Sequence, residues 1–358
     1  MSQRMIDQFI EMVKIDSESG NEARMIDYLC LEFEKLGGVA QKDSYGNLIV
    51  KFGSKNNSSK DPILLSCHAD TVKPGINIEP VIKDGVIRSK GNTILGADDK
   101  AGIAEMLEAL RIAENYPPLE IAISREEEVG LLGVKNMDFS LLSAKKGFLL
   151  DNDTLNTIII GGPSYYVLDV NIKGRAAHAG MEPEKGCNSI LAASKAISAL
   201  RLGRLDHETT ANVGVIEGGV IRNGVPENTS FLAECRSLNH EKAENLANEM
   251  NSIIKKEAES IGAEVTIDIK NLCKAVDIPG DSETVLLSKK ALNSVGIDAK
   301  TTFMTGFTDA SIYNNKGIEV AVVGIGAQLE HSTDEFIKIE DMEKAVKMII
   351  EILRLSAE

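Results

Sequence analysis

The sequence lacks a long apolar segment and is poor in basic residues. No apolar run approaches the roughly 20 residues needed to cross a bilayer, and the N-terminal residues lack the apolar core of a signal peptide. The chain has 39 basic and 54 acidic residues, which give a net charge of −15. An excess of negative charge disfavours nucleic acid and anionic membranes as partners. These absences exclude nucleic-acid-binding and membrane-spanning proteins.

Cysteines are also few, and they are scattered along the chain. There are five, an odd number, and none of them forms a Cys-x-x-Cys pair. They are Cys30, Cys67, Cys187, Cys235 and Cys273. This usage predicts reduced thiols in a cytoplasmic protein rather than a disulfide framework.

What the chain does contain is an alternation of apolar strand-like runs and helical stretches. Its 358 residues, 43% of them apolar, are natural for two domains. Runs that do not alternate between apolar and polar residues predict strands buried on both faces. They lie at residues 63–67, 119–123, 147–150 and 320–324. Helical patterns between them, such as 100–115, predict an α/β domain with a mostly parallel sheet.

A block at residues 164–275 predicts a second, inserted domain. Its elements follow the order β-α-β-β-α-β, which is the ferredoxin-like pattern. The predicted strands are 165–172, 211–217, 229–236 and 264–269, and the predicted helices are 188–200 and 240–260. The first domain is then discontinuous, comprising residues 1–163 and 276–358.

Two local features of the first domain carry smaller predictions. The polar tract 54–60 predicts a loop. Ser19 or Asn21 is a candidate N-cap for the second of two helices in the first 37 residues.

Imidazole and carboxylate side chains follow several of the predicted strands. In parallel sheets the carboxyl ends of the strands face one crevice, so these side chains are expected to converge. Nitrogen and carboxylate ligands gathered in this way suit a pair of divalent metals and a general base. The candidates are His68, Asp70, Asp98, Glu126, Glu127, Glu128, Asp151 and His331.

Each motif also has a simpler explanation. Asp98 and Asp99 are able to cap the helix that begins at Lys100, and three consecutive glutamates are often a solvated surface. The occurrence of all these motifs in order, mostly at strand ends, favours the metal site.

Asp98 is predicted to bridge two metals with its two carboxylate oxygens. His68 with Asp151, and His331 with Glu128, would complete two similar sites. Such oxygen-rich sites suit two Zn²⁺ ions per subunit, with Co²⁺ or Mn²⁺ as possible substitutes.

Two neighbouring residues are predicted to act without binding metal. Glu127 is the predicted general base on the bridging water, although a register shift of one residue would give this role to Glu126. Asp70 is predicted to hold the second N–H of the His68 imidazole.

The inserted domain holds a histidine surrounded by small residues. His178 lies in the sequence Ala-Ala-His-Ala-Gly, in a loop before a helix. It is able to donate a hydrogen bond to a developing oxyanion. The alternative is an ordinary histidine of a surface loop.

Taken together, these motifs resemble the M20 family of metallopeptidases, and most closely its peptidase T (tripeptide aminopeptidase) branch. The resemblance covers essentially the whole chain. The matching segments are His-Ala-Asp at 68–70, Gly-Ala-Asp-Asp-Lys-Ala-Gly at 96–102, Glu-Glu-Val-Gly at 127–130, Ala-His-Ala-Gly at 177–180, Asn-Gly-Val-Pro at 223–226 and His331.

The resemblance implies features that the residues alone do not show. The catalytic domain would have a zinc-peptidase-like architecture, and the inserted domain would be a lid that mediates a homodimer. Asn223 would contact substrate together with His178. The bond between Asp98 and Asp99 is often cis in relatives. Thr305 stands where peptidase T has a substrate-binding arginine, so strict tripeptide selectivity is not implied.

The predicted function is therefore metal-dependent removal of the N-terminal residue from short peptides, with tripeptides as the expected substrates. The alternative is an M20-type amide hydrolase that acts on N-acyl amino acids or dipeptides. A third alternative is a non-catalytic peptide-binding relative, which should lack a ligand or the base.

Overall fold

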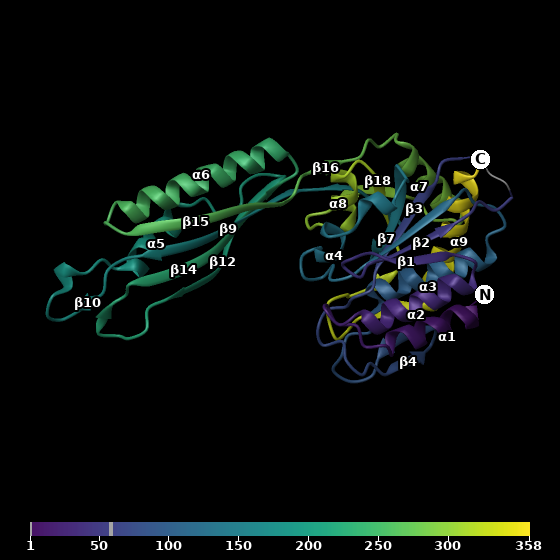
Figure 1. Cartoon of the computed structure of the whole chain (residues 1–358), viewed down its shortest axis with the longest axis horizontal. Coiled ribbons are helices and arrows are strands. Elements are labelled where there is room, and N and C mark those ends of the chain that lie inside the picture. Colours follow the sequence, from purple (N-terminus) through teal and green to yellow (C-terminus); the bar gives the residue numbers. More distant parts are fainter. Residues whose placement is uncertain (1, 57–59) are drawn as a thin grey trace. The chain divides into compact units, whose positions relative to one another are not determined.

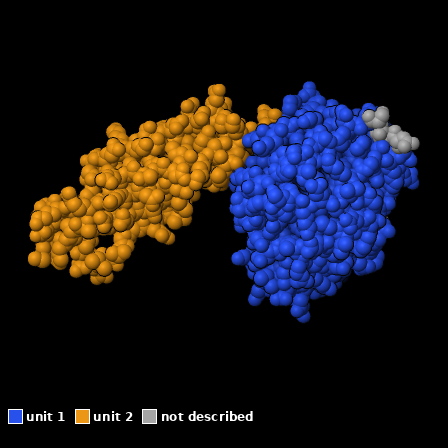
Figure 2. Space-filling view, in the orientation of Figure 1, with its two compact units in different colours: residues 1–161, 278–358 blue, residues 162–277 orange. Residues whose placement is uncertain are grey.

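The computed structural model describes residues 2–56 and 60–358, and it divides into two compact units (Figures 1 and 2). Unit 1 comprises residues 1–161 and 278–358, and unit 2 comprises residues 162–277. Unit 2 is thus inserted into the sequence of unit 1. Part of the predicted loop at 54–60 lies outside the described residues.

Unit 1 is built around a mixed sheet with a parallel centre. The strand order is β1-β2-β6-β3-β7-β18-β8, and β17 also pairs with β8. The bounds are β1 (Val39–Lys42), β2 (Leu48–Phe52), β3 (Ile63–His68), β6 (Leu119–Ser124), β7 (Lys146–Asn152), β8 (Thr157–Gly162), β17 (Lys300–Phe303) and β18 (Glu319–Gly324). Strands β6, β3, β7 and β18 run parallel, whereas β1, β2 and β8 join antiparallel neighbours. All residues of β3 and β6 are buried, which explains why their sequences do not alternate.

Helices pack on this sheet and on one another. They are α1 (Ser2–Val13), α2 (Ala23–Lys35), α3 (Ala97–Ile112), α4 (Leu132–Lys135), the 3₁₀ turn η1 (Phe139–Leu141), α7 (Glu283–Ser294), α8 (Asp309–Asn315) and α9 (Ile339–Ser356). Helix α3 contacts β3 and β7, α7 contacts β7 and β18, and α9 contacts both helices. In the described part of the chain, no helix has the length and apolarity required to cross a membrane.

A small antiparallel sheet joins two loops of unit 1 that matter for function. Its order is β19-β20-β5-β4. The strands are β4 (Pro80–Lys83), β5 (Val86–Ser89), β19 (Ala327–Gln328) and β20 (Phe336–Lys338). Strands β4 and β5 precede Asp98 in the chain, whereas β19 and β20 flank His331.

Unit 2 has the β-α-β-β-α-β order expected from the sequence. Its five-stranded antiparallel sheet has the order β11-β12-β14-β9-β15. The bounds are β9 (Ser164–Lys173), β10 (Ala177–His178), η2 (Pro183–Lys185), α5 (Ser189–Ala199), β11 (Gly203–Arg204), β12 (Thr209–Gly218), β13 (Gly224–Val225), β14 (Asn228–Ser237), α6 (His240–Glu259), β15 (Glu264–Cys273) and β16 (Val276–Asp277). Together with the parallel sheet of unit 1, this topology confirms the predicted fold class.

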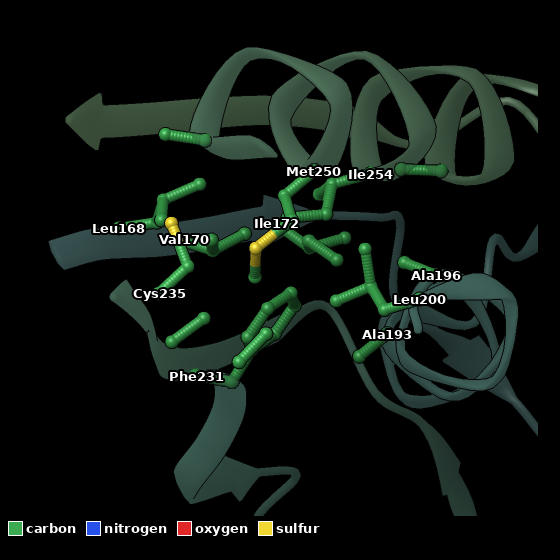
Figure 3. Close-up of a cluster of buried hydrophobic side chains, with 14 of the residues drawn as sticks. Leu168, Val170, Ile172, Ala193, Ala196, Leu200, Phe231, Cys235, Met250 and Ile254 are labelled. Atoms are coloured by element: carbon green, nitrogen blue, oxygen red, sulfur yellow. The ribbon is translucent and has the colours of Figure 1, made fainter. Parts of the chain in front are cut away.

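One face of the unit 2 sheet packs against α5 and α6 to form a hydrophobic core (Figure 3). Leu168, Val170 and Ile172 alternate along β9 with more exposed residues. They meet Phe231 of β14 and Met250 of α6 in this core. Apolar and polar residues alternate in the second half of the sequence 165–172, and this alternation predicts a strand with one buried face.

The predicted N-cap of α2 is wrong. The helix begins at Ala23 and its N-cap residue is Glu22, which makes no side-chain capping bond. Ser19 is instead bonded to Asp70. A tertiary partner has therefore replaced the local capping interaction that the pattern suggested.

Candidate metal centre

Asp98 lies between two histidines. Its Oδ1 is 3.1 Å from Nε2 of His68, and its Oδ2 is 3.2 Å from Nε2 of His331. His68 is the last residue of β3, and His331 lies between β19 and β20 with a φ of 59°. A carboxylate that presents one oxygen to each of two imidazoles has the arrangement needed to bridge two cations.

Two further carboxylates stand beside these histidines. Oε1 of Glu128 is 2.9 Å from Nε2 of His331, and Oδ1 of Asp151 is 3.6 Å from Nε2 of His68. The structure therefore brings together the five residues predicted as ligands, with one histidine and one further carboxylate on each side of Asp98. Their role as ligands stays a prediction.

Asp99 is a carboxylate of this cluster that the sequence analysis did not assign as a ligand. Ligand atoms of His68, Asp99 and Asp151 lie within 4.8 Å of one another, as do those of His68, Asp98 and Glu128. Oδ2 of Asp99 accepts the backbone N–H of His68 at 3.1 Å, and its buried Oδ1 has no hydrogen-bond partner among the described residues. A buried carboxylate oxygen left without a donor fits a site that receives a cation. The peptide bond between Asp98 and Asp99 is cis.

The capping alternative for Asp98 and Asp99 does not describe the observed helix start. Both residues have non-helical backbone angles, and the N-cap Gly96 makes no side-chain capping bond. The N–H groups of residues 95–98, ahead of this point in the chain, donate to Glu335. Burial raises the pKa of Glu335 to about 7, while these N–H groups act in the opposite direction.

The cluster is strongly anionic, and its residues are buried or partly buried except for His331, whose side chain is exposed. Burial alone would lower the pKa of His68, but neighbouring carboxylates, led by Asp151, raise it well above its ordinary value. Burial raises the pKa of Asp151 to about 7 and that of Glu127 well above its usual range. Buried carboxylates crowded in this way are unfavourable unless cations compensate them.

A cavity of about 30 Å³ adjoins Asp98 and Asp151. Asp153, Glu330 and Ile325 also line it. This volume is about the share of one molecule in liquid water, so it has room for a small ion or a water. The donor set, the orphaned oxygen of Asp99 and this space all fit divalent metal ions.

Asp70 connects β3 to the loop that holds the glutamates. Its Oδ1 is 3.3 Å from Nδ1 of His68 and accepts the N–H of Glu127 at 2.9 Å. Its Oδ2 accepts the N–H of Glu128 at 3.2 Å and the hydroxyl of Ser19 at 2.7 Å. Nδ1 of His68 is also 3.0 Å from the carbonyl oxygen of Asp70. Burial acts to raise the pKa of Asp70, but His68 and these donors lower it overall.

Adjacent glutamates face different partners. Glu126 has a φ of 50°, and its Oε2 accepts the hydroxyl of Tyr45 at 2.6 Å. The carboxylate of Glu127 interacts electrostatically with His68 and Asp151. Glu127 is therefore the glutamate of this pair that interacts with the metal cluster, whereas the carboxylate of Glu126 is bonded to Tyr45.

Asp309 is a second buried carboxylate that the sequence analysis missed as a site residue. It begins α8, and its Oδ2 accepts the hydroxyl of Ser124. Burial raises the pKa of Asp309 to about 7, and the charge of His68 acts to lower it. The signal in the sequence that could have identified Asp309 as a site residue is its position after Phe307 and Thr308, at the start of a helix.

The segments that carry His178 and Asn223 lie side by side in unit 2, because β10 pairs with β13 and His178 is opposite Gly224. The N–H of Ala179 donates to the carbonyl of Asn223 at 3.0 Å. Nδ1 of His178 accepts the N–H groups of Gly180 and Met181, both at 3.2 Å. A neutral ring that accepts at Nδ1 carries its proton on Nε2. His178 therefore presents an exposed side chain with an N–H donor.

Known proteins resemble the chain along its whole length. A family model for the "Peptidase dimerisation domain" matches residues 166–262, and a model for "Peptidase family M28" matches residues 47–179. The chain is 35% identical to the uncharacterized protein YqjE of Bacillus subtilis, over 99% of this chain and 98% of the relative.

Two crystal structures are similar in both sequence and fold. The aminopeptidase PepT of Bacillus cereus has 34% identity and a TM-score of 0.93, and a tripeptidase of Staphylococcus aureus has 32% identity and a TM-score of 0.95. Each match covers 100% of this chain and 99% of the other. Fold and site together define a metal-dependent peptidase. The chain belongs to the M20 family of peptidases, in its peptidase T-like branch.

Proposed function

We propose that the protein is an aminopeptidase that uses two Zn²⁺ ions per subunit to remove the N-terminal residue from short peptides, with tripeptides as the expected substrates. The observation that carries this proposal is the position of Asp98, whose two oxygens face Nε2 of His68 and Nε2 of His331. Co²⁺ and Mn²⁺ are possible substitutes for a site rich in oxygen ligands.

The metal ions, when bound, supply the Lewis acidity that makes water nucleophilic at neutral pH and polarises the scissile carbonyl. Glu127 accepts the proton of the attacking water and delivers it to the departing amine nitrogen as the C–N bond breaks. The bond between Tyr45 and Glu126 supports Glu127 over Glu126 in this role. Asp70 orients the ring of His68 through its contact with Nδ1.

Unit 2 supplies the substrate contacts in this proposal. The Nε2–H of His178 donates to the oxyanion that develops on the carbonyl oxygen, and Asn223 contacts the peptide. The acceptor role of Nδ1 in His178 supports this use of Nε2. The chain is proposed to form a homodimer through unit 2, which the match to a peptidase dimerisation domain supports. Cytoplasmic location stays a prediction.

The experiment compares a free-amine tripeptide with the same peptide acetylated at its N-terminus. Zinc-loaded protein is expected to release the N-terminal residue from the free peptide, and chelated protein should not. Cleavage of the acetylated peptide alone would assign the protein to the N-acyl amide hydrolases. Metal-independent cleavage, or no cleavage of either peptide, would contradict the proposal.

A further inference from the structure

Glu335 is a buried carboxylate whose hydrogen-bond partners among the described residues are all backbone N–H groups. Its Oε2 accepts the N–H groups of Leu95 and Gly96, both at 2.7 Å. Its Oε1 accepts those of Ala97 at 2.8 Å and Asp98 at 3.1 Å. Only 2% of Glu335 is exposed. Hydrogen bonds to an ionised acceptor are shorter and stronger than neutral ones.

These four N–H groups lie where a helix provides no acceptor. The first N–H groups of a helix have no carbonyl partner within it. In α3 the gap is extended, because Asp98 and Asp99 have non-helical backbone angles. Leu95 and Ala97 are fully buried, so water does not replace the missing acceptor. The carboxylate of Glu335 therefore determines the path of the chain that leads into Asp98.

The same side chain belongs to the loop that holds His331. Glu335 follows His331 by four residues, and its own N–H donates to the carbonyl of Ser332 at 3.2 Å. The N–H of Asp334 donates to Oγ of Ser332, also at 3.2 Å. Directly after Glu335, β20 pairs with β5. These interactions stabilise the loop that carries His331. Glu335 therefore connects this loop to the loop that carries Asp98.

We propose that Glu335 is a positioning residue for the metal centre. Glu335 holds the carboxylate of Asp98 and the imidazole of His331 at the separation that the metal ions require. It acts through the backbone and contacts neither substrate nor metal. The inference rests on the proposed two-metal site, but its test uses metal binding instead of peptide hydrolysis.

The test is a Co²⁺ titration of metal-free wild-type protein and of Glu335→Gln. An amide nitrogen in place of one carboxylate oxygen would face two backbone donors and lose both bonds. Changes to residues that support metal ligands typically weaken metal affinity about 10–100-fold. The variant is expected to show a loss of this size and a changed visible absorption band of bound Co²⁺. At saturating metal, kcat is expected to fall while KM changes little.

Two other buried glutamates of α3 serve as controls. Both carboxylate oxygens of Glu105 lack a hydrogen-bond partner among the described residues, so Glu105→Gln should bind Co²⁺ as the wild type does. Glu108 forms a bidentate pair with Arg4. Glu108→Gln should lower the melting temperature and leave the Co²⁺ spectrum unchanged, which separates lost stability from lost positioning.

The outcomes distinguish this inference from the proposed function. If wild-type protein binds fewer than two ions, the two-metal function is wrong and the inference falls with it. If wild-type protein binds two ions and Glu335→Gln binds them with equal affinity and spectrum, the positioning role alone is overturned. If Glu335→Gln does not fold, Glu335→Asp takes its place, because it keeps the charge and shortens the reach. The same criteria then apply to that variant.

Discussion

The hydroxyl of Ser19 donates a 2.7 Å hydrogen bond to Oδ2 of Asp70, although the two residues are 51 positions apart. This bond joins the segment before α2 to the end of β3. Asp70 also accepts the backbone N–H of Glu127 and contacts the ring of His68. The hydroxyl of Ser19 therefore completes the set of donors that hold Asp70 against its histidine.

Ser19→Ala is expected to lower kcat about 10-fold with little change in KM. A hydrogen bond to a charged group contributes about 1.5–3 kcal/mol, and its loss leaves Asp70 less firmly oriented toward His68. Steady-state kinetics on a tripeptide, with zinc content measured in parallel, would check this. Ser17→Ala is the control, because the buried hydroxyl of Ser17 has no hydrogen-bond partner in the described chain. Equal kcat in both variants would contradict the role of Ser19.

Glu127→Gln is expected to retain both zinc ions and to lose about 10²–10⁴-fold in kcat, the usual contribution of a general base. An amide of the same shape is not able to accept the proton of the attacking water. The matched control is Glu126→Gln, which keeps an oxygen for the Tyr45 hydroxyl and should stay near wild-type activity. The reverse result would assign the base to Glu126.

Removal of metal is expected to lower the melting temperature. Zinc at about 100 times its dissociation constant stabilises a one-site protein by about 2.7 kcal/mol, and here it also compensates buried carboxylates such as Asp151. Calorimetry at several zinc concentrations should show a melting temperature that rises with zinc. Asp98→Asn should show a weaker dependence, because it weakens the bridge between the two sites. A wild-type melting temperature that does not respond to zinc would argue against the metal centre.

Gly102→Ala is expected to destabilise the fold by about 1–3 kcal/mol, the range for overpacked buried sites, and to weaken metal binding. A Cβ at this position would lie 2.3 Å from Oδ1 of Asp99 and 2.6 Å from the carbonyl oxygen of Leu150. Either α3 moves away from β7 or Asp99 is displaced. Chemical denaturation and zinc titration would measure the two effects. Gly280→Ala provides the comparison, since its added Cβ has no heavy atom of the described residues within 4 Å, apart from Gly280 and its two neighbours in the chain.

Local pattern was sufficient for the central parallel strands of unit 1 and for the main strands and helices of unit 2. The non-alternating run at 63–67 predicted a strand buried on both faces, and β3 is entirely buried. The alternation near Leu168 predicted a strand with one buried face, and β9 has that pattern. These predictions succeed because the number of buried faces decides the sequence pattern. Apolar residues are consecutive in a strand buried on both faces, and they alternate with polar residues in a strand buried on one face.

The sequence by itself determined the α/β class, the inserted ferredoxin-like unit and five residues of the cluster around Asp98, because strand ends carry these side chains in a readable order. It did not assign Asp99 or Asp309 to that cluster. Only the tertiary structure decided how that cluster is supported. Ser19 was predicted as a helix cap and bonds to Asp70, while Glu335 accepts the N–H groups of residues 95–98, which lead into Asp98 and Asp99. These contacts join segments far apart in the chain, so they depend on strand order and loop path, which the local spacing of residues does not encode.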